Sequence, residues 1–337
     1  MTSQVLSASQ RDWIAARSKA LLQGLMQDAC VLGLDISHLN NGTMIIDCGV
    51  NTSGSLEAGR RITEISQGGM TCTHIGTTEI SGIVLPELVV DTWVPKLSAY
   101  GLQVSVALSE IDPAIRISGP ILARFPEGRL DTPRENLLDA AWGISVVESD
   151  QLPSSEVADA LTHRSGFPTE DLALIVVPTS SVAGVTQIAG RINESVLFTM
   201  EESLGIDCSC VSQLLAAVPI ALPTDVSAAS PVTPDDFIHY LGRVILTINR
   251  DLGMDLAELA SQLVFRSTPI YGKLFTELLS AAGGVFEAIP GLVNLNKVAQ
   301  VTVIDQRSGR TFSAGERNEV ILFGQHQKQG TDLKEAP

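Results

Sequence analysis

The segment that most constrains the fold runs from Leu172 to Glu202, LALIVVPTSSVAGVTQIAGRINESVLFTMEE. It begins with a short apolar run, Leu172 to Val177, which predicts a buried strand. A polar turn, Pro178 to Ser181, ends the run, and a long helical pattern follows. Serine or threonine before an apolar periodic segment is a helix N-cap signal, because the side-chain oxygen accepts a hydrogen bond from an unpaired backbone N–H. We therefore expect a strand, a turn and a helix, the geometry that points a helix N-terminus into a cleft.

Three polar residues of this helix, Gln187, Arg191 and Glu194, are spaced four and three apart, so they share one face. Their neighbours are small or apolar, and Gly190 beside Arg191 lets another group approach the backbone closely. Two interpretations are open. The pair Arg191–Glu194 is either an ordinary surface ion pair, worth ~0.3–0.5 kcal/mol, or part of a functional site.

Strand and helix patterns alternate along the rest of the chain. Helices are expected at 4–33, 54–65, 154–164 and 254–264, and strands at 43–48, 70–75, 83–90, 102–108, 144–148 and 244–248, with a closing hairpin at 298–305 and 310–314. This alternation predicts an α/β protein of mixed sheets with packed helices, in two lobes around a cleft. We expect residues 1–325 to form this single two-lobed unit, and residues 326–337 to form a flexible tail.

Composition excludes several classes of function. The 337-residue chain has a net charge of −16 and no run of lysine or arginine, so duplex nucleic acid and membrane surfaces are not expected partners. It has no run of eighteen apolar residues and no basic start followed by an apolar core, which predicts neither a membrane span nor a signal peptide. We expect a cytoplasmic protein.

The five cysteines are odd in number and scattered, and Cys208 and Cys210 form C-x-C rather than a zinc-type C-x-x-C pair. We expect buried free thiols in a reducing cytosol. No P-loop, GxGxxG, HExxH or GxSxG motif is present, so we expect no metal and no nucleotide cofactor.

Three motifs carry a resemblance to a known family. PTSSVAGVTQIAGRINES, at 178–195, resembles the segment P-T-[AS]-S-x-x-G-x-x-Q-x-x-[AG]-R-x-x-E of methenyltetrahydromethanopterin cyclohydrolases. NGTMIIDCGVNTSGSLEAGR, at 41–60, is similar to that family's N-G-x-x-[VI]-[IV]-D-[CA]-G-V…G-x-x-A-G, and SGRTFSAGERN, at 308–318, to its T-G-[KR]-x-[YF]-x-A-G-E-x-N. The motifs agree in order and distance over about 280 residues, so the chain is identified as a divergent member.

The resemblance implies a hydrolase of one-carbon metabolism in methanogens and methylotrophic bacteria. The reaction interconverts N5,N10-methenyltetrahydromethanopterin and N5-formyltetrahydromethanopterin, and a homo-oligomer is implied. We assign the general base to Glu194, because a carboxylate in a water-poor site has its pKa raised toward neutrality. Arg191 would orient that carboxylate or the water. Gln187 would position the pterin, and Thr179 and Ser180 at the helix start are further candidates for substrate binding.

Three further patches show where the chain departs from the family. ISGPILAR, at 117–124, stands where the family has G-S-G-P-A-R, so Ser118 and Gly119 are kept as substrate contacts while the role of Arg124 is in doubt. Such a turn would expose backbone N–H groups to a ligand. The family's T-G before 217 is lost, and in PVTPDD, at 231–236, only an acid remains, which we take to be Asp236.

Two residues keep two interpretations each. Lys273, in an IYGKLF segment similar to the family's Y-G-[KR]-x-F, either reaches a carboxylate or phosphate on the substrate tail or is an ordinary exposed lysine. Asp47, inside an apolar run, is either catalytic or a buried acid satisfied by a turn.

The altered patches also leave other functions open. The chain is either a cyclohydrolase for this carrier or a catalytically impaired paralogue that binds a pterin or an enzyme partner of the one-carbon pathway. Cyclohydrolase action on a different folate-like carrier is a third hypothesis. Retention of Gln187, Arg191 and Glu194 together favours catalysis.

Overall fold

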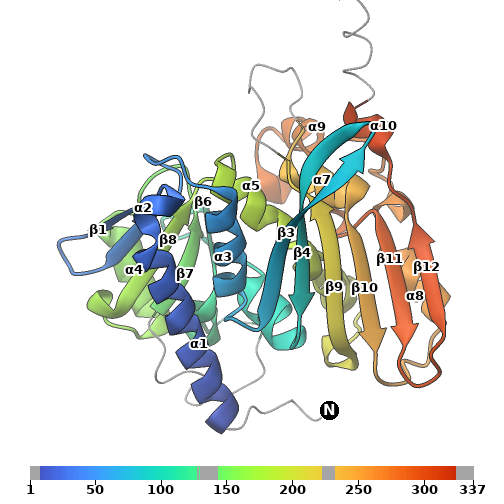
Figure 1. The fold of residues 1–337 in the computed structure, drawn as a ribbon, viewed down its shortest axis with the longest axis horizontal. Coiled ribbons are helices and arrows are strands. Elements are labelled where there is room, and N and C mark those ends of the chain that lie inside the picture. The colour runs from blue at the N-terminus through green and yellow to red at the C-terminus, as the bar shows by residue number, and fades with distance from the viewer. Residues whose placement is uncertain (1–7, 127–128, 130–142, 222–231, 324–337) are drawn as a thin grey trace, which may run out of the picture.

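The computed structural model describes residues 8–126, 129, 143–221 and 232–323. These residues form two six-stranded mixed sheets with helices packed against them, one sheet in each of two lobes (Figure 1). The α/β architecture predicted from the sequence is therefore confirmed. The expected tail at 326–337 lies outside the described residues.

The first sheet has the strand order β1-β2-β8-β7-β6-β5. Its strands are β1 (Asp35–His38), β2 (Met44–Asp47), β5 (Val106–Leu108), β6 (Asp112–Ser118), β7 (Gly143–Glu148) and β8 (Leu172–Val177). The three strands β2, β8 and β7 run parallel, so their carboxyl ends meet at one edge of the sheet. All six residues of β8 are buried, as expected for an interior strand covered on both faces.

Helices cover both faces of this first sheet. They are α1 (Ala8–Gln27), α2 (Ala29–Leu32), α3 (Leu56–Ser66) and α4 (Ser155–Ser165). Leu25 of α1 and Ile62 of α3 pack with Ile175 on one face, while Leu161 of α4 packs with Leu174 on the other. The helix expected at 4–33 is thus two helices in its described part.

The second sheet has the order β12-β11-β10-β9-β4-β3. Its strands are β3 (Thr71–Ile80), β4 (Ile83–Thr92), β9 (Val211–Pro219), β10 (Arg243–Ile248), β11 (Gln300–Asp305) and β12 (Thr311–Gly315). Only β10 and β11 run parallel. One face packs into the largest core cluster, and the other leaves Leu215 and Ile245 partly exposed.

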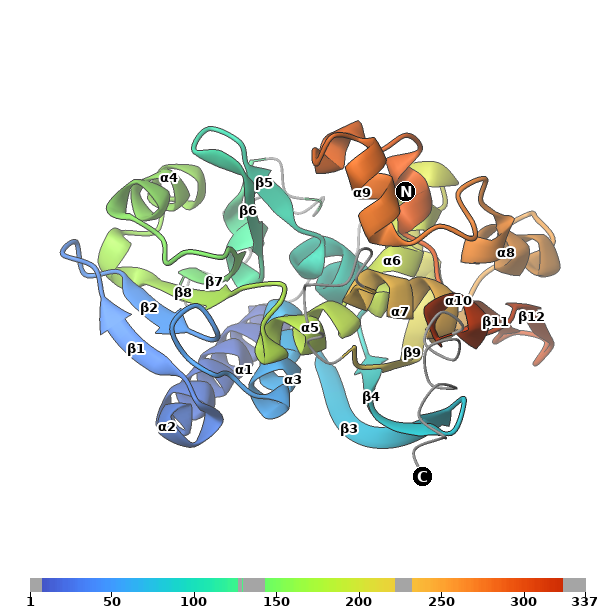
Figure 2. The same cartoon turned by 90° about the horizontal axis from the view of Figure 1, so that it is seen from above.

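The remaining helices pack between and beside the sheets. They are α5 (Val182–Ala189), α6 (Ile192–Phe198), α7 (Pro234–Leu241), α8 (Leu256–Gln262), α9 (Phe275–Ala281) and α10 (Glu319–Phe323), with a π-helix at Lys96–Gln103. Figure 2 shows α5 between the two lobes, next to α3 and α7. Its Ala183 belongs to the core of the first lobe, while Val185 and Ile188 belong to that of the second.

The long helix predicted after the polar turn is interrupted. It is divided into α5 and α6 by Gly190 and Arg191, which form a turn. At Gly190 a Cβ atom would lie 2.2 Å from Oγ1 of Thr63 on α3, so only glycine permits this approach.

The cysteines are free, but not all are buried. Cys48, Cys208 and Cys210 are buried as expected, while Cys30 and Cys72 are exposed. Among the described helices, none is long and apolar enough to cross a membrane.

Candidate active site

Arg191 is the point where three segments of the chain meet. Its Nη1 donates to Oε1 of Glu148 at 2.9 Å, and its Nη2 donates to Oε1 of Glu194 at 2.9 Å and to the carbonyl of Gln103 at 3.0 Å. Only 10–12% of the surface of each of the three charged side chains is exposed. The interpretation of Arg191 and Glu194 as an ordinary surface ion pair is therefore wrong.

Glu148 is the site residue that the sequence analysis missed. It closes β7, directly opposite Val177 of β8, at the edge where the parallel strands end. Its Oε1 also accepts a hydrogen bond from Nε2 of Gln187 at 2.7 Å. An acid at the end of the predicted strand 144–148 was the available signal, because ligands of α/β sheets bind at the carboxyl ends of strands.

The two acids beside Arg191 have strongly shifted pKa values. Burial raises the pKa of Glu194 to about 7, and the negative charge of Glu148 adds to this effect while Arg191 opposes it. Burial, together with the charges of Asp236 and Glu148, raises the pKa of Asp235 to about 7. The burial of the guanidinium acts to lower the pKa of Arg191, but the negative charges of Glu148 and Glu194 outweigh it and raise this pKa.

Two buried oxygens of this cluster have no hydrogen-bond partner among the described residues, Oε2 of Glu194 and Oε1 of Gln187. The other oxygen of Glu194 accepts a hydrogen bond from Arg191, and the amide nitrogen of Gln187 donates one to Glu148. A buried oxygen without a partner is costly unless a ligand or water supplies the hydrogen bond. The arrangement therefore offers two fixed acceptors, one of them a carboxylate that gains and loses a proton near neutral pH.

Asp236, the acid that remains in the altered patch at 231–236, is buried at the start of α7. It caps α7, where its Oδ2 accepts from the backbone and side chain of Thr233, and its Oδ1 accepts from the N–H of Phe275. Asp235, one residue earlier, is the acid whose pKa responds to Glu148 and Arg191. Asp236 is thus used by its own helix, because a helix N-cap box uses the third helical residue and points it back at the cap.

Asp47 ends β2 at the same sheet edge, but its carboxylate is used by its own loop. It accepts from the N–H groups of Gly49, Val50 and Asn51. Although burial acts to raise the pKa of Asp47, these hydrogen bonds lower it below its usual value. The structure therefore favours the interpretation of Asp47 as an acid satisfied by a turn.

In the turn before α5, Ser181 caps the helix, while Thr179 and Ser180 are exposed. Ser181 is the N-cap, and its Oγ accepts from the N–H of Gly184 at 3.0 Å, as predicted. Thr179 and Ser180 are exposed, and their side chains make no hydrogen bond to the described residues. They lie between the end of β8 and the start of α5, the helix that carries Gln187.

Ser118 and Gly119 are buried at the end of β6 in the first lobe. Ser118 is paired with Val146, two residues before Glu148 on β7, and is 1% exposed. Its Oγ has no hydrogen-bond partner in the described part of the chain. The N–H of Gly119 donates to the carbonyl of Leu102 at 2.7 Å, so this N–H is not free for a ligand.

Lys273 is exposed in the segment before α9, and its ammonium group makes no hydrogen bond to the described residues. Its backbone carbonyl accepts from the hydroxyl of Tyr240. No hydrogen bond or ion pair among the described residues joins Lys273 to Arg191, and its role remains a prediction.

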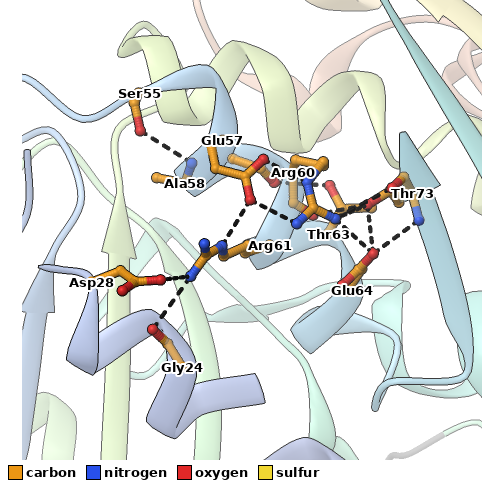
Figure 3. Close-up of polar contacts among 11 residues, drawn as sticks. Gly24, Asp28, Ser55, Glu57, Ala58, Arg60, Arg61, Thr63, Glu64 and Thr73 are labelled. Carbon is orange, nitrogen blue, oxygen red and sulfur yellow. Dashed lines mark hydrogen bonds and ion pairs between the residues drawn. The ribbon is translucent and has the colours of Figure 1, made fainter. Parts of the chain in front are cut away.

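A polar network on α3 ties this helix to Asp28 in the first lobe and to β3 in the second (Figure 3). Arg60 contacts Glu57, Glu64 and Thr73 of β3, while Arg61 contacts Glu57 and Asp28. On the opposite side, α3 packs against α5 at Gly59, where a Cβ atom would lie 2.4 Å from the carbonyl of Ala183. The network thus fixes the surface on which α5 rests. No group of three or more histidine, cysteine or acidic side chains in the described residues is placed to hold a metal ion.

Comparison with known proteins identifies the family of the chain. The model of the family described as "Cyclohydrolase (MCH)" matches residues 14–324. The methenyltetrahydromethanopterin cyclohydrolase of Methanococcus maripaludis (strain C7) is 32% identical over 299 residues, covering 86% of this chain and 91% of that protein. The enzymes of the same name from Methanothermobacter marburgensis and Methanocaldococcus jannaschii are 30% and 29% identical, and cover 91% and 92% of this chain and 96% and 97% of their own lengths. The chain therefore belongs to the MCH cyclohydrolase family.

Proposed function

We propose that this protein interconverts N5,N10-methenyltetrahydromethanopterin and N5-formyltetrahydromethanopterin, as a hydrolase acting on a cyclic amidine C–N bond. The relatives named above carry this activity in their names. The observation that carries the proposal is the buried carboxylate of Glu194. One of its oxygens is held by Arg191, and the other has no partner among the described residues.

The chemistry requires a base and then an acid. The bridging carbon of the cationic substrate is already electrophilic, so attack by water forms a C–O bond while Glu194 takes the proton of the water. The C–N10 bond of the resulting adduct then breaks, N10 receives a proton, and the remaining hydroxyl proton leaves to give the formyl group. A group with a pKa of about 7 is suited to both transfers, because it is neither fully protonated nor fully ionised at neutral pH.

The other residues of the cluster have supporting roles in this proposal. Arg191 holds Glu194 in one rotamer and balances its charge after the proton is lost. Gln187 offers its Oε1 to a donor group of the pterin. Glu148 and Glu194 contact Arg191, and Asp235 and Arg129 act on the cluster through their charges. Acids outnumber arginines here, which favours a cationic ligand over an anionic one. Thr179, Ser180, Ser118, Gly119 and Lys273 are proposed to line the path of the substrate.

The test is the loss of the methenyl chromophore when the purified protein meets methenyltetrahydromethanopterin, with methenyltetrahydrofolate in parallel. We expect loss with the first carrier and not the second. Loss with the folate alone would keep the chemistry and change the carrier. No loss with either, while calorimetry still detects binding, would replace the proposal with that of a catalytically impaired pterin-binding paralogue.

We further propose that the protein acts in the cytoplasm as a homo-oligomer, as its resemblance to the family implies. Free cysteines, two of them exposed, suit a reducing compartment. Light scattering of the purified protein measures the assembly, and a mass equal to one chain of 35.8 kDa would contradict it.

A further inference from the structure

Glu148 holds two residues of the site through one atom. Its Oε1 accepts from Nε2 of Gln187 at 2.7 Å and from Nη1 of Arg191 at 2.9 Å. Gln187 lies in α5, and Arg191 lies in the turn between the helices as the N-cap of α6, so Glu148 joins both helices to the end of β7. Charge-assisted hydrogen bonds of this kind are stronger than neutral ones and fix the direction of a planar guanidinium.

The orientation of both partners follows from this contact. Because Oε1 of Glu148 accepts, the amide of Gln187 turns its nitrogen toward Glu148 and its oxygen away. With Nη1 held by Glu148, Nη2 of Arg191 meets Oε1 of Glu194 and the carbonyl of Gln103. The oxygens left over are Oε1 of Gln187 and Oε2 of Glu194, both buried and without a partner among the described residues.

We infer that Glu148 is a positioning residue for the reaction: it fixes Gln187 and Arg191 so that the site presents acceptor oxygens to the substrate. The inference rests on the proposed function, since it assigns Glu148 a role in the same site.

A second consequence concerns the charge of the base. The charged groups that act on Glu194 are Arg191 at the start of α6, Glu148 on β7 and Arg129 in the segment after β6. Arg129 in turn pairs with Glu202, which also accepts from the hydroxyl of Tyr100. Of these groups Glu148 is the acid that raises the pKa of Glu194, and Arg191 and Arg129 lower it.

Asp235 on α7 also belongs to this set of charges. Its pKa is raised by burial, by Asp236 and by Glu148, and lowered by Arg191. Removal of the charge of Glu148 therefore lowers the pKa of both Glu194 and Asp235. Ionised Glu194 is then present at lower pH. The fall in the reaction rate on the acidic side of the pH profile, its acidic limb, therefore moves to lower pH.

The experiment compares Glu148→Gln, Glu148→Asp and a matched control, Glu87→Gln. Glu87 pairs with Arg243 at 2.6 Å in the second sheet, and its side chain is 12% exposed, as is that of Glu148. We expect Glu148→Gln to lower kcat about 10- to 100-fold, as misplacement of catalytic groups does, with KM nearly unchanged and the acidic limb moved to lower pH. Glu87→Gln should keep the kcat and the profile of the unmodified protein.

Glu148→Asp separates orientation from charge. It keeps the negative charge but withdraws the carboxylate by one methylene, so we expect a lower kcat with the acidic limb nearly unmoved. An unchanged kcat in this variant, or a Glu148→Gln protein that matches Glu87→Gln in kcat and in pH profile, would overturn the inference. Thermal unfolding of each variant identifies any protein that is merely misfolded.

Titration without substrate distinguishes failure of this inference from failure of the proposed function. Carbon-13 NMR of labelled glutamate follows the ionisation of Glu194, with Glu194→Gln to assign its signal. We expect a lower pKa for Glu194 in Glu148→Gln than in the unmodified protein, whichever substrate the enzyme accepts. An equal pKa in both would refute the role of Glu148, whereas a lower pKa in an inactive protein would refute only the proposed reaction.

Discussion

Nη2 of Arg191 lies 2.9 Å from Oε1 of Glu194, and the two side chains are 12% and 10% exposed. A contact between opposite charges is much stronger in such surroundings than in water, but it also costs desolvation of both groups. Removing one partner leaves the other as a buried, unbalanced charge. The pair is therefore expected to respond sharply to substitution.

Replacing the base tests its chemistry directly. Glu194→Gln keeps the size of the side chain but cannot accept the proton of water, so we expect kcat to fall ~10²–10⁴-fold. The rate is measured from the absorbance of the methenyl substrate, with Glu87→Gln as the control. A Glu194→Gln protein within tenfold of full activity would refute the assignment.

Replacing Arg191 tests the geometry of its guanidinium. Lysine has a single ammonium group and cannot hold Glu148, Glu194 and the carbonyl of Gln103 in one plane, so Arg191→Lys should lower kcat at least about tenfold. Arg243→Lys is the matched control, since Arg243 is 41% exposed and its pair with Glu87 is outside the site. Equal activity of the two variants would contradict the prediction. Arg191→Ala should in addition cost about 3–5 kcal/mol of stability, because two buried acids lose their counter-charge.

The activity of the unmodified enzyme should depend on pH. Glu194 must be ionised to take a proton from water, and its pKa is raised to about 7 by burial. The value of kcat/KM should therefore fall about tenfold for each pH unit below about 7, and level off above it. A profile that stays flat from about pH 5 to pH 8 would show that a group with an unshifted pKa acts as the base.

Stability should change with pH in the opposite direction. Between the ordinary pKa of glutamate, 4.5, and about 7, the folded protein keeps a proton on Glu194 that the unfolded chain has lost. The free energy of unfolding therefore falls as pH rises through this window, by up to about 3 kcal/mol for this one residue. Glu194→Gln removes this contribution.

Unfolding by urea at both ends of the window measures this difference. Stability should decline less with pH in Glu194→Gln than in the unmodified protein. Asp207 and Glu57, whose pKa values are lowered, act only at lower pH and do not obscure the comparison. The same decline in both proteins would show that Glu194 titrates normally in the folded state.

The close packing of α3 on α5 gives a further prediction. In Gly59→Ala the new Cβ would lie 2.4 Å from the carbonyl of Ala183, so α5 must shift. We expect a loss of about 1–3 kcal/mol and a lower kcat, because α5 carries Gln187. Gly24→Ala is the control in α1, because a Cβ atom at this position would meet no other part of the protein within 4 Å. This variant should be as stable as the unmodified protein or more stable by about 0.5–1 kcal/mol. Equal stability of the two variants, measured by urea unfolding, would contradict the close approach.

Local sequence patterns predicted much of the site. The apolar run Leu172–Val177 is β8 with the same bounds, and Ser181 is the N-cap of α5. The spacing of Gln187, Arg191 and Glu194 was sufficient to bring them into one cluster, although the helix is interrupted between the first and the last. These features depend on neighbours within a few residues, so the sequence alone reveals them.

The residues that were missed depend on contacts between distant segments. Glu148 is 43 residues from Arg191 and meets it only because β7 pairs with β8 in parallel. Asp235 rather than Asp236 acts on the site because the N-cap of α7 occupies its neighbour. The close approach at Gly190 was expected from the glycine, but its partner, Thr63 of α3, is given only by the tertiary structure.

The sequence by itself thus determined many of the strands and helices, the family resemblance and the Gln187, Arg191 and Glu194 set, because periodicity, capping and motif spacing are local properties. Tertiary structure alone decided which acids surround Arg191 and how far each is buried. Burial and the distances between charges set the pKa of Glu194, and both arise only when the ends of β7 and β8, the π-helix at Lys96–Gln103 and α5 to α7 come together.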